Sequence, residues 1–156
     1  MFRPMRRFKQ QLSEEECARI LQTEPRGVLA VLGDEDYPYT VPLDFVCHQG
    51  KLYFHGAGQG HKIDALTRHD KVSFCVMDQG YREEGDWALY IRSVVVFGRL
   101  RVVTDPAQTE EMARLIGLKY YPDPAEVEKE LQQALDRVTI LELTPDHMTG
   151  KLVHEK

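Results

Sequence analysis

The sequence predicts a mostly β protein, a small and mostly antiparallel barrel of about six strands with peripheral helices. Apolar segments of strand length recur from residue 27 onward, and short turns join the first of them, which favours antiparallel pairing. Helices do not alternate regularly with these strands, which argues against a doubly wound parallel sheet. The 156 residues, 42% of them hydrophobic, suffice for one core, and we predict a single domain over residues 1–156.

The first predicted element is a short flanking helix that begins after Ser13. Ser13 as N-cap and Glu16 three residues later form a capping box pattern. Apolar residues then recur at helical spacing, namely Cys17, Ile20 and Leu21. Pro25 lies just beyond the expected end of this helix.

The period changes to that of β-strands at residue 27. Residues 27–32 are a continuous apolar run, and residues 33–36 form a turn. Residues 39–46 are apolar at odd positions, so one face is buried. Pro42 cannot donate a ladder hydrogen bond. We therefore expect this strand to lie at the edge of the sheet, or to be kinked or bulged at Pro42. Gln49-Gly50 predicts a hairpin turn into a strand over residues 51–55.

A glycine-rich link over residues 56–60 leads to a short helix from His61, and the next strand spans residues 72–77. We expect Cys75, in that apolar strand, to lie in the core. A polar loop over residues 78–86 precedes a long β-type stretch from Trp87 to Val103. Gly98 within it predicts a bulge or bend.

Two helices follow, and the same dipeptide, Asp-Pro, marks the start of each. Asp105-Pro106 and Asp123-Pro124 each supply an N-cap and a proline in the first helical position. The last predicted strand spans residues 138–143. We expect Thr144-Pro145 to end it and to leave residues 144–156 as a tail.

Charge and cysteine usage narrow the function classes. The 20 basic and 25 acidic residues give a net charge of −5, which argues against a nucleic-acid binder. Four cations lie within the first nine residues, where they either pack across a subunit contact or belong to a solvated terminus.

Three cysteines without a C-x-x-C pair predict free thiols in the cytoplasm. No apolar run is long enough to span a membrane, and no signal peptide pattern is present.

The segment Tyr53–Lys62 is the densest candidate site. It joins a strand end, the glycine-rich bend and a helix start that carries His61 and Lys62. Small residues allow a ligand close to the backbone, and free N–H groups at a helix start favour an anion such as phosphate. The segment is not a P-loop, because Lys62 is followed by Ile63 rather than Ser or Thr. The alternative is a flexible hairpin exit without a ligand.

Other chemistry finds little support in the sequence. His61 and His69 lie about 12 Å apart on a helix and cannot share an ion, so we predict no metal site. No G-x-S-x-G motif is present, and the carboxylates of residues 82–86 are those of a solvated loop. Trp87 and Tyr90 either stack on a flat ligand or belong to the core. A phosphate cradle without an acid, base or nucleophile indicates chemistry supplied by a cofactor.

Several motifs, in order along nearly the whole chain, then carry a family resemblance. They are Met5-Arg6-Arg7, Gly27-Val28-Leu29-Ala30, Tyr39-Thr40-Val41-Pro42-Leu43, Leu52-Tyr53-Phe54-His55-Gly56-Ala57, Gly60-His61-Lys62, Ser93-Val94-Val95-Val96-Phe97-Gly98 and Met148-Thr149-Gly150-Lys151. The chain resembles the flavin-binding split-barrel proteins related to pyridoxamine 5′-phosphate oxidase. Within them it is most similar to the nitroimidazole-resistance (5-nitroimidazole reductase-like) branch.

This resemblance implies a six-stranded antiparallel split β-barrel that forms a homodimer and binds FMN at the subunit interface. By motif, His61 and Lys62 would hold the FMN phosphate with help from Ser93. His55 and Ala57 would line the ribityl chain and the ring edge.

The remaining implied contacts concern the flavin ring. Val41, Pro42 and Leu43 would present backbone to the isoalloxazine, in a strand that kinks where the flavin lies. Trp87 would approach from the partner subunit. The chain departs from true pyridoxamine phosphate oxidases, which resemble one another in an Arg-bearing C-terminal segment, because its own last arginine is Arg137. Pyridoxamine phosphate oxidase activity is therefore not expected.

The leading hypothesis is an FMN-dependent oxidoreductase that reduces 5-nitroimidazole-like or similar electron-poor small molecules, with His55 as a possible proton donor. A nicotinamide electron donor would bind transiently, since no dinucleotide fingerprint is present. One alternative is a flavin or haem binding and sensing dimer without turnover. Another is a structural or regulatory dimer that has lost its cofactor.

Overall fold

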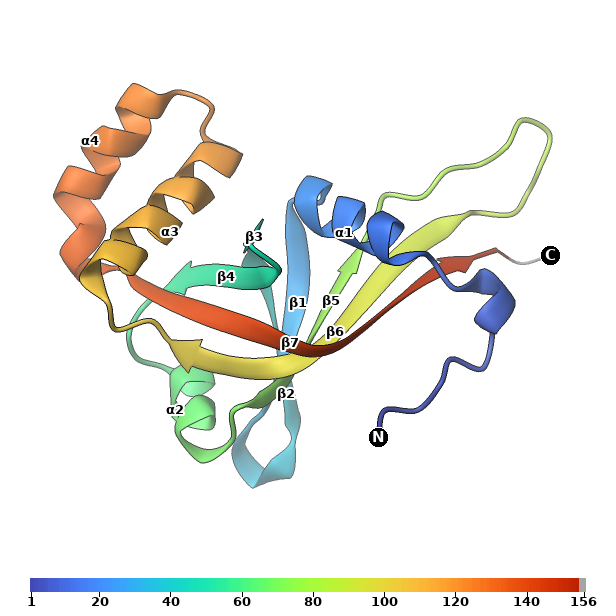
Figure 1. The fold of residues 1–156 in the computed structure, drawn as a ribbon, viewed down its shortest axis with the longest axis horizontal. Helices are drawn as coiled ribbons and strands as arrows, with labels where there is room; N and C mark the ends of the chain where they lie inside the picture. Colours follow the sequence, from blue (N-terminus) through green and yellow to red (C-terminus); the bar gives the residue numbers. More distant parts are fainter. Residues whose placement is uncertain (155–156) are drawn as a thin grey trace.

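The computed structural model describes residues 1–154, and its centre is one antiparallel sheet curled into a half-barrel (Figure 1). The sheet has seven strands in the order β2-β1-β5-β6-β7-β4-β3. Their bounds are β1 Arg26–Leu32, β2 Pro38–Asp44, β3 Val46–His48, β4 Lys51–Gly56, β5 Lys71–Met77, β6 Ile91–Val102 and β7 Thr139–Val153. The predicted antiparallel split barrel is confirmed, with β3 as an additional short strand.

Helices pack around this sheet rather than alternating with its strands (Figure 1). They are α1 Glu14–Thr23, α2 His61–Arg68, α3 Pro106–Tyr120 and α4 Pro124–Ala134, with 3-10 turns η1 Phe8–Gln10, η2 Asp34–Asp36 and η3 Leu135–Arg137. The capping box of α1 forms as predicted between Ser13 and Glu16. Asp105 and Asp123 cap α3 and α4, each followed by proline, so these helix starts are confirmed.

The main core lies inside the curled sheet. Phe74 packs edge-on against Phe45 and Phe54, with ring centroids 5.0 and 4.9 Å apart. Ile63 and Leu66 of α2 pack against this cluster, as their helical spacing predicts. A second cluster forms where α3 lies over β4 and β7. These two clusters bury both faces of β7 at its start, where residues 140–143 are all buried.

Pro42 and Gly98 behave as the sequence predicts. Pro42 lies in β2, an edge strand, where a missing N–H costs no ladder bond on the open side. The pairing of β6 with β7 shifts between Phe97 and Gly98. A Cβ at Gly98 would lie 2.3 Å from the Thr144 carbonyl oxygen, so the bulge requires glycine.

Three sequence predictions are wrong. Thr144-Pro145 does not end the last strand, because the bulge opposite Gly98 accommodates Pro145 and β7 continues to Val153. Residues 87–90 precede β6 instead of belonging to it. Cys75 is exposed rather than in the core, because Val72, Phe74 and Val76 take the inward positions of β5.

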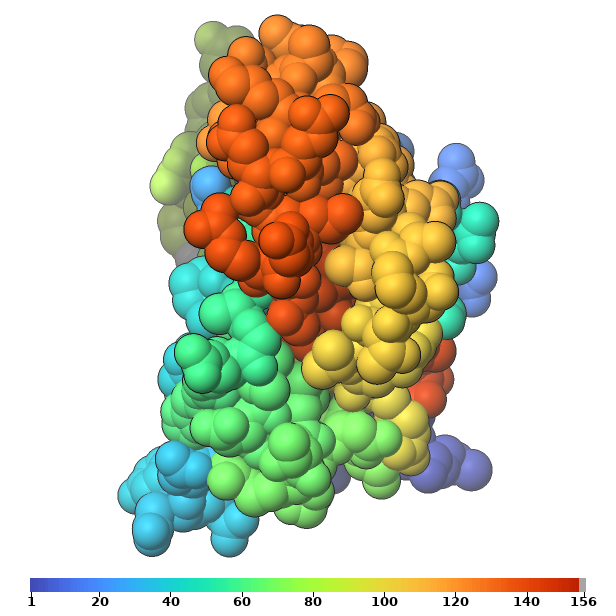
Figure 2. Space-filling view, turned by 90° about the vertical axis from the view of Figure 1, so that its left-hand side faces the viewer, coloured from blue at the N-terminus to red at the C-terminus, as the bar shows by residue number. Residues whose placement is uncertain are grey.

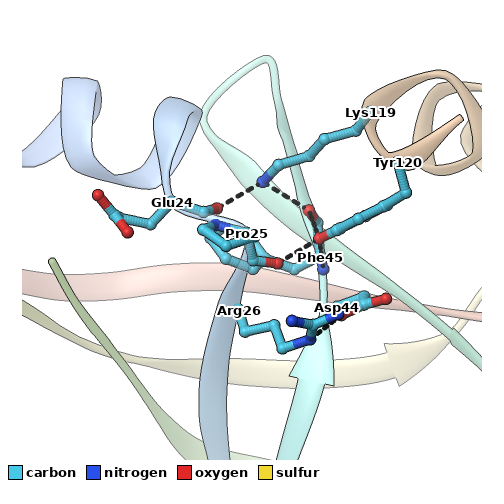
Figure 3. A network of polar contacts seen from close by, with 7 residues as sticks. All are labelled: Glu24, Pro25, Arg26, Asp44, Phe45, Lys119 and Tyr120. Atoms are coloured by element: carbon cyan, nitrogen blue, oxygen red, sulfur yellow. Dashed lines mark hydrogen bonds and ion pairs between the residues drawn. The ribbon is translucent and has the colours of Figure 1, made fainter. Parts of the chain in front are cut away.

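A clamp of polar contacts joins the end of α3 to the strands (Figure 3). The Lys119 ammonium donates to the carbonyl oxygens of Glu24 and Phe45, each at 2.8 Å, and lies 4.0 Å from the centroid of the Phe45 ring. The Tyr120 hydroxyl accepts from the Phe45 N–H at 2.8 Å. Burial lowers the pKa of Lys119. The clamp satisfies backbone groups at the break between β2 and β3 that no strand pairs.

Candidate functional site

The glycine-rich link forms a turn between the end of β4 and the start of α2. Gly60, the residue before α2, has φ +114°, a conformation open to glycine alone, and a Cβ there would meet nothing within 4 Å. No side chain caps the start of α2, so its first N–H groups have no side-chain acceptor. The turn therefore presents backbone donors to an open surface.

Lys62 lies over this turn. A Cβ at Gly56 would be 3.1 Å from the Lys62 Nζ, so the absence of a side chain there lets the ammonium approach the backbone. Within residues 1–154 no carboxylate lies within ion-pair distance of Lys62. An uncompensated cation beside free N–H groups has the chemistry of a phosphate site.

His61 faces the turn between β1 and β2. Its ring stacks on Tyr39 with centroids 4.1 Å apart, and its Nε2 accepts from the Asp34 N–H at 3.3 Å. Arg68, at the other end of α2, also binds Asp34, at 2.9 Å. Since Nε2 is an acceptor here, a neutral His61 ring carries its proton on Nδ1, which is the atom left to donate to an anion.

The residues of β2 that are predicted to contact the flavin ring lie on both faces of this strand. Val41 and Leu43 are partly buried against the core, whereas Pro42 is exposed and pairs with Val28. One side of the β2 backbone has no neighbouring strand, because β2 is an edge strand. The position of β2 therefore allows its backbone groups to contact a flat ligand.

His55 and Ala57 flank Gly56 and are both exposed. His55 pairs with Ile140 of β7. Ala57 lines a depression of about 410 Å³ between the glycine turn and the start of β7. These two predicted residues thus lie beside Lys62 in the same region of the chain.

Ser93 and Trp87 lie elsewhere in this chain. Ser93 pairs with Met77 at the end of β5. The start of β5, Lys71, follows α2 and lies about 20 Å away along the strand. Trp87 is 68% exposed in the loop that projects between β5 and β6 at the upper right of Figure 1. One chain does not bring these residues to the Lys62 turn.

A buried carboxylate fixes the strands below the turn, and the sequence analysis did not identify it. Glu142 of β7 is 1% exposed and accepts from Lys51 at 3.1 Å, Arg101 at 2.7 Å, Tyr53 at 2.9 Å and Gln108 at 3.1 Å. Burial raises the pKa of Glu142, but the donors outweigh it and hold that pKa at about 2. Three residues further along the ladder, Gly56 pairs with Thr139. Because Glu142 binds β4, β6 and α3 together, it holds the base of the candidate site.

The outer face of the sheet is a second feature that sequence analysis missed. Outward-facing residues on β2, β1, β5, β6 and β7 form uncharged cross-strand rows, namely Pro42, Val28, Cys75, Val95 and Thr149, followed by Thr40, Ala30, Ser73, Phe97 and His147. In these rows Val28 is 40% exposed and Phe97 39%. The alternation of apolar and small residues over 72–76 was the signal that could have revealed this face.

Within the part of the chain that the structure describes, no cluster of His, Cys, Asp and Glu suits a metal ion. No helix of residues 1–154 has the length and hydropathy of a membrane span.

Comparison with known proteins gives one family and several similar structures. Residues 13–152 match the family model described as pyridoxamine 5′-phosphate oxidase. No curated protein sequence matches the chain.

Among solved structures, a protein of Bacteroides thetaiotaomicron described as a 5-nitroimidazole antibiotic resistance protein is 19% identical, with a TM-score of 0.79 over 92% of this chain and 87% of that one. An FAD-binding protein from Mesorhizobium loti is 24% identical, with a TM-score of 0.65 over 92% and 97%. An FAD- and heme-binding protein from Mycobacterium smegmatis is 21% identical, with a TM-score of 0.74 over 92% and 73%. At these identities the likeness shows a shared fold.

Proposed function

Since the chain belongs to the pyridoxamine 5′-phosphate oxidase family, we propose that it is a flavin-dependent oxidoreductase that reduces nitro-aromatic or similar electron-poor small molecules. The observation that carries this proposal is the uncompensated Lys62 ammonium over Gly56, beside the uncapped start of α2. The names of the similar FAD-binding and 5-nitroimidazole resistance proteins support the cofactor class and the substrate class.

The residues of the glycine turn fit the phosphate end of a flavin. Lys62 supplies the charge, the Nδ1–H of His61 and the first N–H groups of α2 supply donors, and the glycines let the phosphate approach. FMN is the smallest flavin that carries this phosphate. A bound flavin supplies the redox chemistry by accepting and passing on a hydride at N5. The chain binds and orients the flavin, and the exposed His55, next to Gly56, would donate a proton to the substrate.

The functional unit in this proposal is a homodimer that uses the outer sheet face. The uncharged rows, in which Val28 and Phe97 are exposed, suit a second copy of this chain, since burial of apolar surface drives such contacts. Ser93 and Trp87, which lie far from Lys62 in one chain, would then join the site from the partner. Val28→Lys places a charge in this face and is expected to give a monomer in analytical ultracentrifugation. A Val28→Lys protein that remains a dimer contradicts this choice of face.

The visible spectrum of the purified protein and a titration with FMN test the cofactor. Lys62→Ala is expected to weaken FMN binding about tenfold or more, since a charge-assisted hydrogen bond contributes about 1.5–3 kcal/mol. Lys129→Ala, which removes an exposed lysine of α4, is the control. A colourless protein that binds no flavin overturns the proposal. Turnover is then measured by anaerobic reduction with a nicotinamide donor followed by addition of a 5-nitroimidazole.

The similar FAD- and heme-binding protein favours one second candidate, a flavin or haem binding and sensing dimer without turnover. A Soret band, or a flavin that a nicotinamide donor fails to reduce, would favour this candidate. In either case the free thiols Cys17, Cys47 and Cys75 suit a reducing cytoplasm, where we place the protein. We expect neither nucleic acid nor membrane as a partner.

A further inference from the structure

The turn between β1 and β2 lies against α2, and side chains from both ends of this helix bind it. In Figure 2 the light-blue residues of the turn adjoin the green α2 at the lower left. Arg68, the last residue of α2, binds the Asp34 carboxylate at 2.9 Å. His61, the first residue of α2, accepts from the Asp34 N–H at 3.3 Å. One residue of the turn therefore contacts both ends of the helix.

The turn is held in a backbone conformation that its residues rarely adopt. Glu35 and Asp36 have φ of +55° and +61°, in the left-handed region. Such conformations persist where the surrounding contacts determine them. Here the Gly33 N–H donates to the Tyr37 carbonyl oxygen at 2.8 Å, and the Tyr37 N–H donates to the Asp34 carbonyl oxygen at 3.0 Å. The turn therefore fixes the position of the Asp34 backbone.

Two further contacts hold the imidazole of His61 at this turn. Its ring stacks on Tyr39 with centroids 4.1 Å apart and an angle of 24° between the ring planes. A Cβ at Gly33 would lie 2.9 Å from the His61 Nε2 and 2.9 Å from the Tyr39 Cβ. The turn can therefore approach this edge of the ring only because residue 33 has no side chain. Together these contacts keep the Nε2 edge of the ring against the turn.

Asp34 offers the Nε2 atom a partner in both protonation states of His61. In the neutral ring Nε2 accepts from the Asp34 N–H, which leaves the proton on Nδ1. In the protonated ring Nε2 carries a hydrogen, and the Asp34 carboxylate Oδ2 lies 3.6 Å from it. In both states Nδ1 carries a proton and can donate to an anion.

We propose that Asp34 and Arg68 are positioning residues of the phosphate site. Arg68 ties Asp34 to α2, and Asp34 holds His61 in the form whose Nδ1–H is available to the phosphate. Both residues act through His61 rather than by contact with the phosphate. This inference rests on the proposed flavin function and adds the β1–β2 turn to the site.

The tautomer of His61 is the first test, and it needs no flavin. Nitrogen-15 NMR of the flavin-free protein at about pH 9, where an ordinary histidine is neutral, distinguishes the two tautomers. The His61 signals are those missing from the spectrum of His61→Ala. Wild type is expected to show the Nδ1–H form. Arg68→Ala releases the Asp34 carboxylate and is expected to give a mixture of both tautomers.

Titrations with FMN connect the tautomer to binding. Arg68→Ala is expected to weaken FMN binding about fivefold, since the histidine no longer presents one fixed donor. In a His61→Ala background the same Arg68→Ala change should cause no further loss, because the arginine acts only through the histidine. Arg114→Ala, which removes an ion pair between α3 and α4, is the matched control. It should leave the tautomer and the FMN affinity unchanged.

The outcomes separate this inference from the proposed function. The positioning role is wrong, and the flavin function stands, if wild type binds FMN but shows the Nε2–H form of His61. The same holds if Arg68→Ala leaves the tautomer unchanged, or weakens FMN equally with and without His61. A wild type that binds no flavin overturns the proposed function and this inference with it, whatever the tautomer.

Discussion

Replacing Glu142 by glutamine tests whether its buried charge holds the base of the site. The carboxylate is 1% exposed and has four donors around it, among them Lys51 and Arg101. Glutamine keeps the shape and can still accept from Tyr53, but it removes the charge. The side chains of Lys51 and Arg101 are 38% and 54% exposed, so both can turn to water in the variant. The loss is then that of the carboxylate interactions, without a stranded buried cation.

The pKa gives the magnitude and its sign. A carboxyl with a pKa of about 2 in the folded protein and about 4.3 in the unfolded chain stabilises the fold by about 3 kcal/mol at pH 7. Because the folded pKa is the lower one, this contribution is complete above the unfolded pKa and is lost as the pH falls toward 2. At pH 3 about 1.4 kcal/mol remains.

Urea unfolding of wild type and Glu142→Gln between pH 7 and pH 3 measures this difference. The gap in unfolding free energy is expected to be about 3 kcal/mol at pH 7 and about half of that at pH 3. Glu126→Gln, at an exposed pair with Lys129, is the matched control and should show no such gap. A gap of the same size at both pH values refutes the charge explanation and leaves only a packing defect.

Substitutions at three further positions test local features of the fold. Gly60→Ala forces a side chain into φ +114° and should cost about 1–3 kcal/mol in urea unfolding; an unchanged stability would mean that the turn relaxes. Lys119→Met leaves the carbonyl oxygens of Glu24 and Phe45 without their donor and should cost about 2–3 kcal/mol, whereas Lys119→Arg should lose less; equal losses in both variants would contradict this account. Ser13→Ala removes the N-cap of α1 and should cost about 1 kcal/mol, seen as a melting temperature about 2–4 °C lower; an unchanged melting temperature would show that the α1 start is already frayed.

Features with a local cause could be predicted from the sequence. The Asp-Pro pairs before α3 and α4 and the capping box of α1 set helix starts through contacts within a few residues. The turn at Gln49-Gly50 has positive φ at both residues, as its composition predicts. Pro42 could be assigned to an edge because the reason is the missing N–H of one residue.

Features that depend on distant segments could not be predicted. Pro145 continues a strand only because Gly98 of β6 provides a bulge opposite it. Glu142 is buried because α3 covers one face of β7 and the core covers the other, which no alternation within residues 138–143 can indicate.

The candidate site also contains residues that could be predicted from the sequence and residues that could not. His61 and Lys62 adjoin the glycines in sequence, so an anion-binding turn could be predicted from one segment. Ser93 and Trp87 rest on resemblance alone, and their roles stay predictions.

The position of β7 between β6 and β4 has a consequence for the order of events on the ribosome. The β3–β4 hairpin is made early, yet it joins the sheet only through β7, which is synthesised much later. Until residues 139–143 leave the exit tunnel, the hairpin and the glycine turn after it have no ladder partner. The nascent chain must therefore keep Tyr53 and Phe54 from other apolar surfaces until β7 emerges, and the glycine turn gains its ladder partner only then.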